Sequence, residues 1–355
     1  MGTSNDKDIL TLWENEQTRA VQRNLRALII QPGALGDGIL TLPLVRLLKE
    51  ILSIGGVDIL GHAETLGVFP QRTCVDSIRS IETVDLQRLF IDPKDFTLAD
   101  RDPLIYAFSE YTWIISFLGE PDSHFEQNLL YTVHCSHSAE IITLPLKPPT
   151  DYPQHVTRFY QEHFLQSLFL PPSPGAPTLV DTPIQATEDD RQLGQRLLQQ
   201  RGVNCDRPLT VLHPGSGGQA KCWHLDNFLA LASQLSNRDH EVAFLIGPVE
   251  QERWPAETLQ KLRAAAPFLD DLTLEQTLAV LAHAQSVVAN DSGISHLAAG
   301  LGTQTVVLFG PTTPSLYRPV GPQVSIVHDP SPIFNQGPSE VVQAKVRTLL
   351  SNTAD

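Results

Sequence analysis

The feature that most constrains the fold is a pattern that the chain contains twice: an apolar run, a Pro-Gly pair, a glycine-rich loop and an amphipathic helix. The two copies read IIQPGALGDG and VLHPGSGGQA, and their Pro-Gly pairs begin at residues 32 and 214, 182 positions apart. The apolar runs, residues 26–31 and 209–212, are typical of buried parallel strands. We therefore predict an α/β protein of two Rossmann-like domains facing across a cleft, joined by the proline-rich residues 171–177.

A third stretch, VVANDSGISHLAAGLGTQTVVLFGP at residues 287–311, reads as strand, tight turn, short helix and strand. Its polar residues lie at the carboxyl end of the first strand and the amino end of the helix: Asp291, Ser292, Gly293 and His296. Ser292 is a good N-cap candidate. Open α/β sheets bind ligands at this position, and free helix N–H groups favour anions. Taken alone, the stretch also fits an ordinary capped turn with a surface histidine.

Hydrophobic periodicity places most of the remaining elements. Strands are predicted at residues 57–61, 113–117, 139–144, 242–247, 305–309 and 324–328, and helices at residues 155–170, 188–201, 228–235, 274–284 and 339–350. Pro43 fits only the first turn of a helix or a kink, so we expect the helix after the first loop to begin near Thr41. Residues 62–112 and 118–138 show no pattern that assigns them.

Composition excludes several classes of protein. The chain has 355 residues, 41% of them hydrophobic, and no apolar run approaches the roughly 18 residues of a membrane span. Residues 1–24 carry four acidic residues and have no apolar core, which predicts a loosely docked amphipathic arm and not a signal peptide. A net charge of −15 argues against broad nucleic-acid binding and against attraction to anionic lipid.

The four cysteines are scattered and form no CxxC pair: Cys74, Cys135, Cys205 and Cys222. This predicts free thiols in a reducing cytoplasm and argues against a zinc site. Three histidines lie near Cys135, at positions 124, 134 and 137, but solvated loop side chains explain that spacing more simply than a metal site does.

The first glycine-rich loop carries one acid, Asp37, between two glycines that allow close approach of a ligand. Its carboxylate is a candidate general base that deprotonates a hydroxyl nucleophile. The alternative is a helix N-cap, for which Asp is among the best residues. The loop spaces its glycines as G-x-x-G-x-G, which is not the dinucleotide fingerprint, and the chain has no P-loop. These absences argue against a Rossmann dehydrogenase.

The second loop, PGSGGQAKCW, offers backbone N–H groups in a glycine-rich turn, with Lys221 just beyond it. Oriented amides and one ammonium group suit a diphosphate. The alternative is a solvated lysine, although a cation at a helix start opposes the helix dipole. Trp223 is interpreted as a core residue.

These three stretches resemble glycosyltransferase family 9, the heptosyltransferases of bacterial lipopolysaccharide synthesis. The similarity extends over LIIQPGALGDGILTLPLVRLL, VLHPGSGGQAKCWHLDNFLALASQL and VVANDSGISHLAAGLGTQTVVLFGPT, in the family's order and spacing. It implies a GT-B fold, with the acceptor bound to the first domain and a nucleotide-sugar to the second. It also implies inverting transfer from an ADP-heptose-type donor, without a metal or another cofactor.

The resemblance assigns roles residue by residue. Asp37 aligns with the family's catalytic carboxylate, and Glu250 with an acid near the nucleoside. The residues on the diphosphate-contacting loop are Ser216, Gly217 and Lys221, and those on the motif for the donor's sugar and phosphates are Asp291, Ser292, Gly293 and His296. Cys222 is a departure, because the family often has a basic residue there. No acceptor-binding residues can be carried over from residues 62–138.

We therefore predict an N-terminal arm (1–24), an acceptor domain (25–170), a linker (171–177) and a donor domain (178–355), with the option that the last helix packs back on the acceptor domain. The expected partners are a nucleotide-sugar and a glycan or lipid-linked glycan, with no nucleic acid. A cytoplasmic location is expected, with at most peripheral contact at the inner face of the inner membrane. Two alternatives stay open: a GT-B enzyme that uses a UDP- or GDP-sugar, and a catalytically silent nucleotide-sugar-binding protein.

Overall fold

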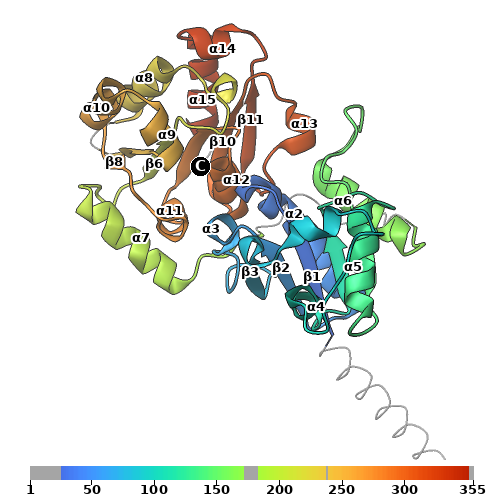
Figure 1. Ribbon diagram of the computed structural model, residues 1–355. Helices are drawn as coiled ribbons and strands as arrows, with labels where there is room; N and C mark the ends of the chain where they lie inside the picture. The colour runs from blue at the N-terminus through green and yellow to red at the C-terminus, as the bar shows by residue number, and fades with distance from the viewer. Residues whose placement is uncertain (1–24, 172–182, 237–238, 352–355) are drawn as a thin grey trace, which may run out of the picture. The chain divides into compact units, whose positions relative to one another are not determined.

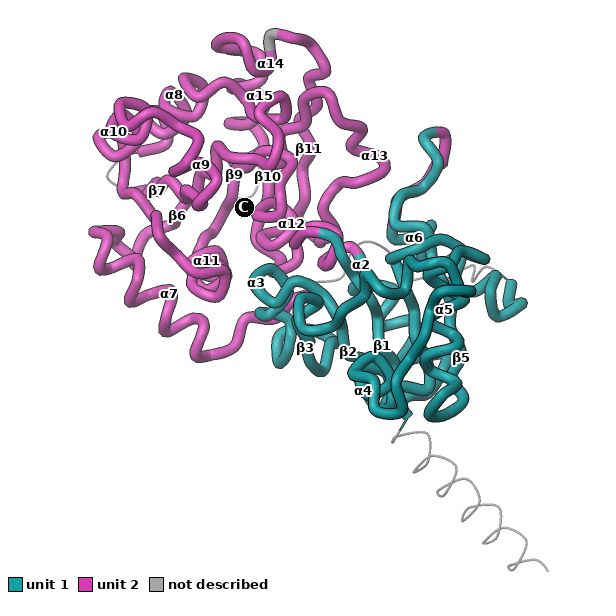
Figure 2. The backbone as a smooth tube through the Cα atoms, viewed as in Figure 1, with its two compact units in different colours: residues 1–33, 41–150, 157–176 teal, residues 34–40, 151–156, 177–355 magenta. Residues whose placement is uncertain are grey.

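The computed structural model describes residues 25–171, 183–236 and 239–351, so the expected arm (1–24) and most of the expected linker (172–177) lie outside the described residues. The described chain forms two compact units, each built on one parallel sheet (Figures 1 and 2). Unit 1 holds residues 25–33, 41–150 and 157–171, and unit 2 holds residues 34–40 and 151–156 together with the described residues from 183 onward.

Unit 1 contains a five-stranded sheet in the order β3-β2-β1-β4-β5, and every pair in it is parallel. Its strands are β1 (Arg26–Gln31), β2 (Gly56–Gly61), β3 (Ser77–Ser80), β4 (Trp113–Ser116) and β5 (Glu140–Thr143). The central strand β1 is almost wholly buried, as expected for a strand covered on both faces. The predicted strands at 26–31, 57–61, 113–117 and 139–144 are confirmed.

The helices of this half of the chain are short where the sequence showed no pattern. They are α2 (Leu35–Leu52), α3 (Ala63–Leu66), α4 (Pro103–Phe108), α5 (His124–His134) and α6 (Val156–Ser167), with 3-10 turns η1 (Ile81–Thr83) and η2 (Leu86–Phe90). One core cluster joins α4, α5 and η2 to strand residues such as Leu28 and Ile30. Local caps begin two of these helices, because Asp102 accepts from Leu104 N–H and Ser123 from Glu126 N–H.

The expected start of α2 near Thr41 is wrong, because the helix begins at Leu35 and includes Pro43 in its interior. Its first turn is closed by the Asp37 carboxylate, which accepts from Ala34 N–H at 3.0 Å, and by the bond from Gly38 N–H to Ala34 O at 3.0 Å. Proline removes one helical hydrogen bond, but burial of the apolar residues around Pro43 stabilises the helix through it.

Unit 2 contains a six-stranded parallel sheet in the order β11-β10-β9-β6-β7-β8. Its strands are β6 (Leu209–His213), β7 (Glu241–Leu245), β8 (Phe268–Leu269), β9 (Ser286–Asn290), β10 (Gln304–Phe309) and β11 (Val324–His328). All of the strands predicted for this region are confirmed within two residues, and β8 is an addition too short to give a periodic signal.

Helices cover both faces of this sheet (Figure 1). They are α7 (Glu188–Gln200), α8 (Leu225–Leu235), α9 (Pro248–Arg253), α10 (Ala256–Ala265), α11 (Leu274–Leu281), α12 (Gly293–Gly300), α13 (Pro314–Tyr317), α14 (Ile333–Gln336) and α15 (Glu340–Ser351), with the 3-10 turn η3 (Gln219–Lys221). Residues of α8, α10 and α15 share one core cluster with the strands. Gly194 lets α7 approach α11, since a Cβ there would overlap the Ala279 carbonyl.

No helix among the described residues combines the length and apolar character needed to cross a lipid bilayer.

Candidate functional site

The polar residues singled out in the second half of the sequence meet where strands β6 and β9 end. These strands are neighbours in the sheet, with His213 opposite Ala289. After β6 the chain continues to β7 on one side, and after β9 it continues to β10 on the other side. The carboxyl ends of β6 and β9 therefore form a topological switch point, which is where open α/β sheets bind ligands.

The start of α12 leaves two buried polar atoms unsatisfied. Ser292 occupies the predicted N-cap position in extended backbone, but the Ser295 hydroxyl accepts its N–H at 3.3 Å. Within the described chain, neither Ser292 Oγ nor His296 Nδ1 has a hydrogen-bond partner, although both atoms are buried. Unpaired buried polar atoms beside a helix N-terminus indicate an anion-binding position.

His296 is buried at this position and does not carry charge near neutral pH. Burial lowers the pKa of His296 to about 4, although the Asp291 carboxylate opposes that shift. The interpretation of His296 as a surface histidine is therefore wrong, since its side chain is only 4% exposed. A neutral imidazole can donate a hydrogen bond to an anion without adding a charge.

Lys221 reaches from the second loop to the α12 turn. Its Nζ lies 2.8 Å from Asp291 Oδ2, and the same oxygen accepts from Thr312 Oγ1 at 3.0 Å. Ser216 Oγ donates to the Asp291 backbone carbonyl at 2.8 Å. Lys221 is thus paired with Asp291 although its side chain is 38% exposed, and this contact joins the two predicted donor stretches.

A buried asparagine holds both ends of the second loop. Asn290 Nδ2 donates to Pro214 O at 2.8 Å and to Gly215 O at 3.3 Å, and Asn290 Oδ1 accepts from Trp223 N–H at 2.9 Å. The side chain of Asn290 is fully buried. Trp223 is a core residue as predicted, with its ring 5.2 Å from that of Phe228. The sequence shows Asn290 only as a turn residue, and nothing local reveals this clamp.

Helix α9 supports the loop from the β7 side. Glu250 is buried and accepts from Gly247 N–H at 3.1 Å, which caps its own helix. Its carboxylate lies so close to Gly215 that a Cβ there would overlap it, which explains the glycine at that position. Arg253 donates to the Ser216 and Gly217 carbonyls, each at 3.3 Å. Arg253 is a site residue that the sequence did not single out. The signal that could have found it is its spacing of three residues from Glu250, which places both side chains on one face of the helix.

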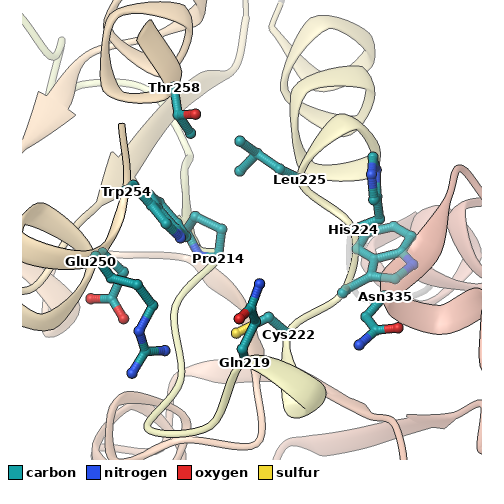
Figure 3. Close-up of a pocket in the computed structure, with 11 residues that line it drawn as sticks. Pro214, Gln219, Cys222, His224, Leu225, Glu250, Trp254, Thr258 and Asn335 are labelled. Carbon is teal, nitrogen blue, oxygen red and sulfur yellow. The ribbon is translucent and has the colours of Figure 1, made fainter. Parts of the chain in front are cut away.

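A cavity of 340 Å³ lies between the second loop and helices α9 and α10. Figure 3 shows Glu250 and Trp254 on one side of it and His224 and Leu225 on the other. Cys222 also lines it, and burial together with the Glu250 carboxylate raises the pKa of that thiol to about 11. The thiol is therefore protonated near neutral pH and adds no charge to the loop.

The structure brings together the predicted donor residues of unit 2: Ser216, Gly217, Lys221, Glu250, Asp291, Ser292, Gly293 and His296. Asp37 lies at the third position of α2, partly exposed, where its carboxylate reaches back to the N-cap N–H. That contact is half of a capping box, so Asp37 closes the first turn from inside the helix and is not its N-cap. A catalytic role for Asp37 stays a prediction.

Comparison with known proteins agrees with this geometry. The model of glycosyltransferase family 9 (heptosyltransferase) matches residues 147–339. The chain is 28% identical over 150 residues to lipopolysaccharide heptosyltransferase 2 of Salmonella typhimurium, covering 41% of this chain and 42% of that protein. It is 29% identical over 185 residues to lipooligosaccharide heptosyltransferase 2 of Haemophilus influenzae, covering 50% and 52% respectively. The matches thus span about half the length of these curated relatives.

Two solved structures share the fold over almost the whole chain. A glycosyl transferase family 9 protein from Veillonella parvula superposes with a TM-score of 0.68 at 16% identity, covering 93% of this chain and 98% of that one. Escherichia coli ADP-heptose LPS heptosyltransferase II superposes with a TM-score of 0.64 at 18% identity, covering 93% and 100%. These likenesses confirm the predicted fold class, an α/β GT-B architecture.

Proposed function

Because the chain belongs to glycosyltransferase family 9, we propose that it is an inverting glycosyltransferase, which transfers a heptose-type sugar from ADP-heptose to a hydroxyl of a glycan. The proposed acceptor is the lipopolysaccharide core or another lipid-linked glycan. Support comes from the relatives above, which are named as lipopolysaccharide and lipooligosaccharide heptosyltransferases.

The observation that carries the proposal is the junction of the second loop with the α12 turn. Lys221 is fixed 2.8 Å from Asp291, beside the unsatisfied Ser292 hydroxyl and the free amides of a helix N-terminus. One cation and several oriented N–H groups are the partners that a diphosphate requires. They would overcome the unfavourable field of a chain with net charge −15.

In the proposed reaction, Asp37 accepts the proton of an acceptor hydroxyl as its oxygen attacks the anomeric carbon. The new C–O bond forms on the face opposite the ADP, and the bond to the ADP oxygen breaks and leaves its electron pair on ADP. Lys221, neutral His296 and the amides at Gly217 and Gly293 stabilise the departing diphosphate without a metal. Losing one such donor typically lowers the rate by about 10²–10³. Glu250 is assigned to the ribose hydroxyls, which carboxylates commonly bind.

Calorimetric titration with ADP, UDP and GDP in EDTA tests the donor. We expect ADP to bind without a metal, and Lys221→Ala to weaken it by about tenfold or more because a charge-assisted contact is lost. The matched control is Lys345→Ala, which removes the same charge from an exposed position on α15 of unit 2. A preference for UDP or GDP would overturn ADP-heptose as the donor. If the protein binds none of the three nucleotides, a catalytically silent protein would be favoured.

A further inference from the structure

The carbonyl groups of the second loop are held from outside by side chains of two other elements. Asn290 binds the Pro214 and Gly215 carbonyls, and Arg253 binds the next two. The contacts from Arg253 are 3.3 Å for Nη1 to Ser216 O and 3.3 Å for Nη2 to Gly217 O. One planar guanidinium, on an exposed side chain, therefore contacts two consecutive peptide groups.

Holding those carbonyls fixes the direction of the amides that follow them. In a planar trans peptide the N–H points opposite to the C=O, and the described chain has no cis peptide bond. The N–H groups of Gly217 and Gly218 therefore point away from Arg253. Neither has a hydrogen-bond partner among the described residues, and a Cβ at Gly217 would meet no atom within 4 Å. Two consecutive N–H groups without partners in the described chain thus lie on the side of the loop away from Arg253.

The second loop has little net positive charge of its own, so these amides are essential for binding an anion there. Lys221 is already paired with Asp291, so its positive charge is partly neutralised before a ligand arrives. Cys222, the next residue, is a protonated thiol. Oriented amides gain affinity for phosphate oxygens when they need no reorganisation on binding.

We propose that Arg253 is a positioning residue for the donor diphosphate, which orients the Gly217 and Gly218 amides toward it from behind the loop. The inference rests on the proposed function, because it takes the second loop as the diphosphate site. It assigns to α9 a role in phosphate recognition, in addition to the nucleoside role of Glu250. The planar guanidinium fork is the feature that matters, because an ammonium group cannot hold both carbonyls in one plane.

The test is titration of wild type, Arg253→Ala and Arg253→Lys with ADP and with adenosine, by calorimetry in EDTA. We expect both variants to lose ADP affinity by about tenfold or more, since two hydrogen bonds to a charged group are misplaced. Adenosine affinity should not change, because adenosine has no phosphate. The matched control is Arg196→Ala, which removes the same charge from an exposed position on α7 of unit 2.

Three results would overturn the role of Arg253: wild-type ADP affinity in Arg253→Ala, wild-type ADP affinity in Arg253→Lys, or an equal loss of ADP and adenosine affinity. Wild-type ADP affinity in Arg253→Lys would indicate that only the positive charge matters. An equal loss of ADP and adenosine affinity would indicate a general disturbance of the site. Urea unfolding of each variant checks that the fold is intact. If the wild-type protein binds none of ADP, UDP and GDP, the proposed function fails, and the inference fails with it.

Discussion

The two Pro-Gly loops begin alike in sequence and are held in different ways. After β1, helix α2 begins within a few residues, and the buried Gln31 side chain ties the loop locally, accepting from Gly33 N–H at 2.9 Å and donating to Thr41 Oγ1 at 2.8 Å. After β6, the chain travels from residue 214 to residue 224 before α8 begins. That longer loop is tied by Asn290, which lies on another strand.

The difference shows what each loop is suited to do. A loop closed by its own helix presents one side chain, Asp37, at a fixed place in the first turn. A loop held by residues far away in sequence can leave consecutive amides unpaired, because its carbonyls already have partners. The first arrangement suits an acid or base, and the second suits an anion.

Replacing the acid of the first loop should have the largest effect. We expect Asp37→Asn to lower kcat by about 10²–10⁴ with ADP-heptose and an acceptor glycan, because the amide cannot accept the proton. Its oxygen can still accept from Ala34 N–H, so ADP affinity should be unchanged. Glu50→Gln, at an exposed position on α2, is the control with the same change of charge. Near-normal turnover in Asp37→Asn would contradict the proposal that the first loop supplies the general base.

Gln31 and Asn290, the buried amide side chains that tie the two loops, offer a direct contrast. We expect Asn290→Ala to lower the free energy of unfolding by about 2–4 kcal/mol, because it leaves buried backbone groups at Pro214 and Trp223 unpaired. It should also abolish ADP binding at micromolar concentrations. Gln31→Ala should destabilise the protein comparably but leave ADP affinity unchanged.

Urea denaturation followed by circular dichroism, with calorimetry for ADP, measures both effects. Gln260→Ala is the control, because that amide side chain is exposed on α10, and it should alter the free energy of unfolding by less than about 0.5 kcal/mol. Equal ADP binding in Asn290→Ala and Gln31→Ala would contradict the distinction between a local and a remote tether.

The buried His296 at the α12 turn should also make stability depend on pH. Burial holds the pKa of His296 at about 4, below its ordinary value of 6.5. Between these values the unfolded chain binds a proton that the folded protein does not, so stability falls as pH falls. The contribution is about 1 kcal/mol per pH unit. His296→Gln should reduce the slope of unfolding free energy against pH by that amount between pH 6 and 5, and leave it unchanged above pH 7.5. Equal slopes for wild type and variant in the lower window would refute this.

The smallest expected effect concerns Thr312, which donates to the same Asp291 oxygen that binds Lys221. Thr312→Val keeps the shape of the side chain and removes one hydrogen bond, so ADP affinity should fall about threefold to fivefold. Thr313→Val is the matched control, since the neighbouring hydroxyl makes no cap bond to α13. If Thr313→Val lowers ADP affinity as much as Thr312→Val does, the loss of affinity is not transmitted through Asp291.

Local sequence patterns predicted both loops and all described strands except β3 and β8, because a strand and a glycine-rich turn are encoded within a few residues. The one wrong helix start shows the limit of such rules. Pro43 ought to end or begin a helix, but tertiary burial around it overrides that preference. Residues 62–112 and 118–138 gave no signal, and apart from α5 their helices and 3-10 turns are short.

The interactions that build the site could not be predicted in the same way. Arg253 meets carbonyls 36 and 37 positions away in sequence, and Asn290 meets carbonyls 75 and 76 positions away. Contacts between a side chain and a distant backbone have no period and no characteristic spacing. Local patterns singled out Lys221 and the polar residues of the α12 turn as an anion site, and the resemblance assigned them to a donor and added Glu250. Neither included the residues that hold the loop in place.

The all-parallel order of the second sheet has a consequence for how the protein folds. Parallel neighbours cannot nucleate on a hairpin, and β7, β8 and several helices lie between β6 and β9 in the sequence. Closing so long a loop is entropically costly, so this pairing belongs to the slow part of folding. The proposed donor site lies at the ends of that pair of strands and should therefore be completed late, after much of the secondary structure of unit 2 is in place. During synthesis, the second loop leaves the ribosome well before the strand that carries Asn290, so the proposed donor site cannot be complete until β9 and the α12 turn have also been synthesised.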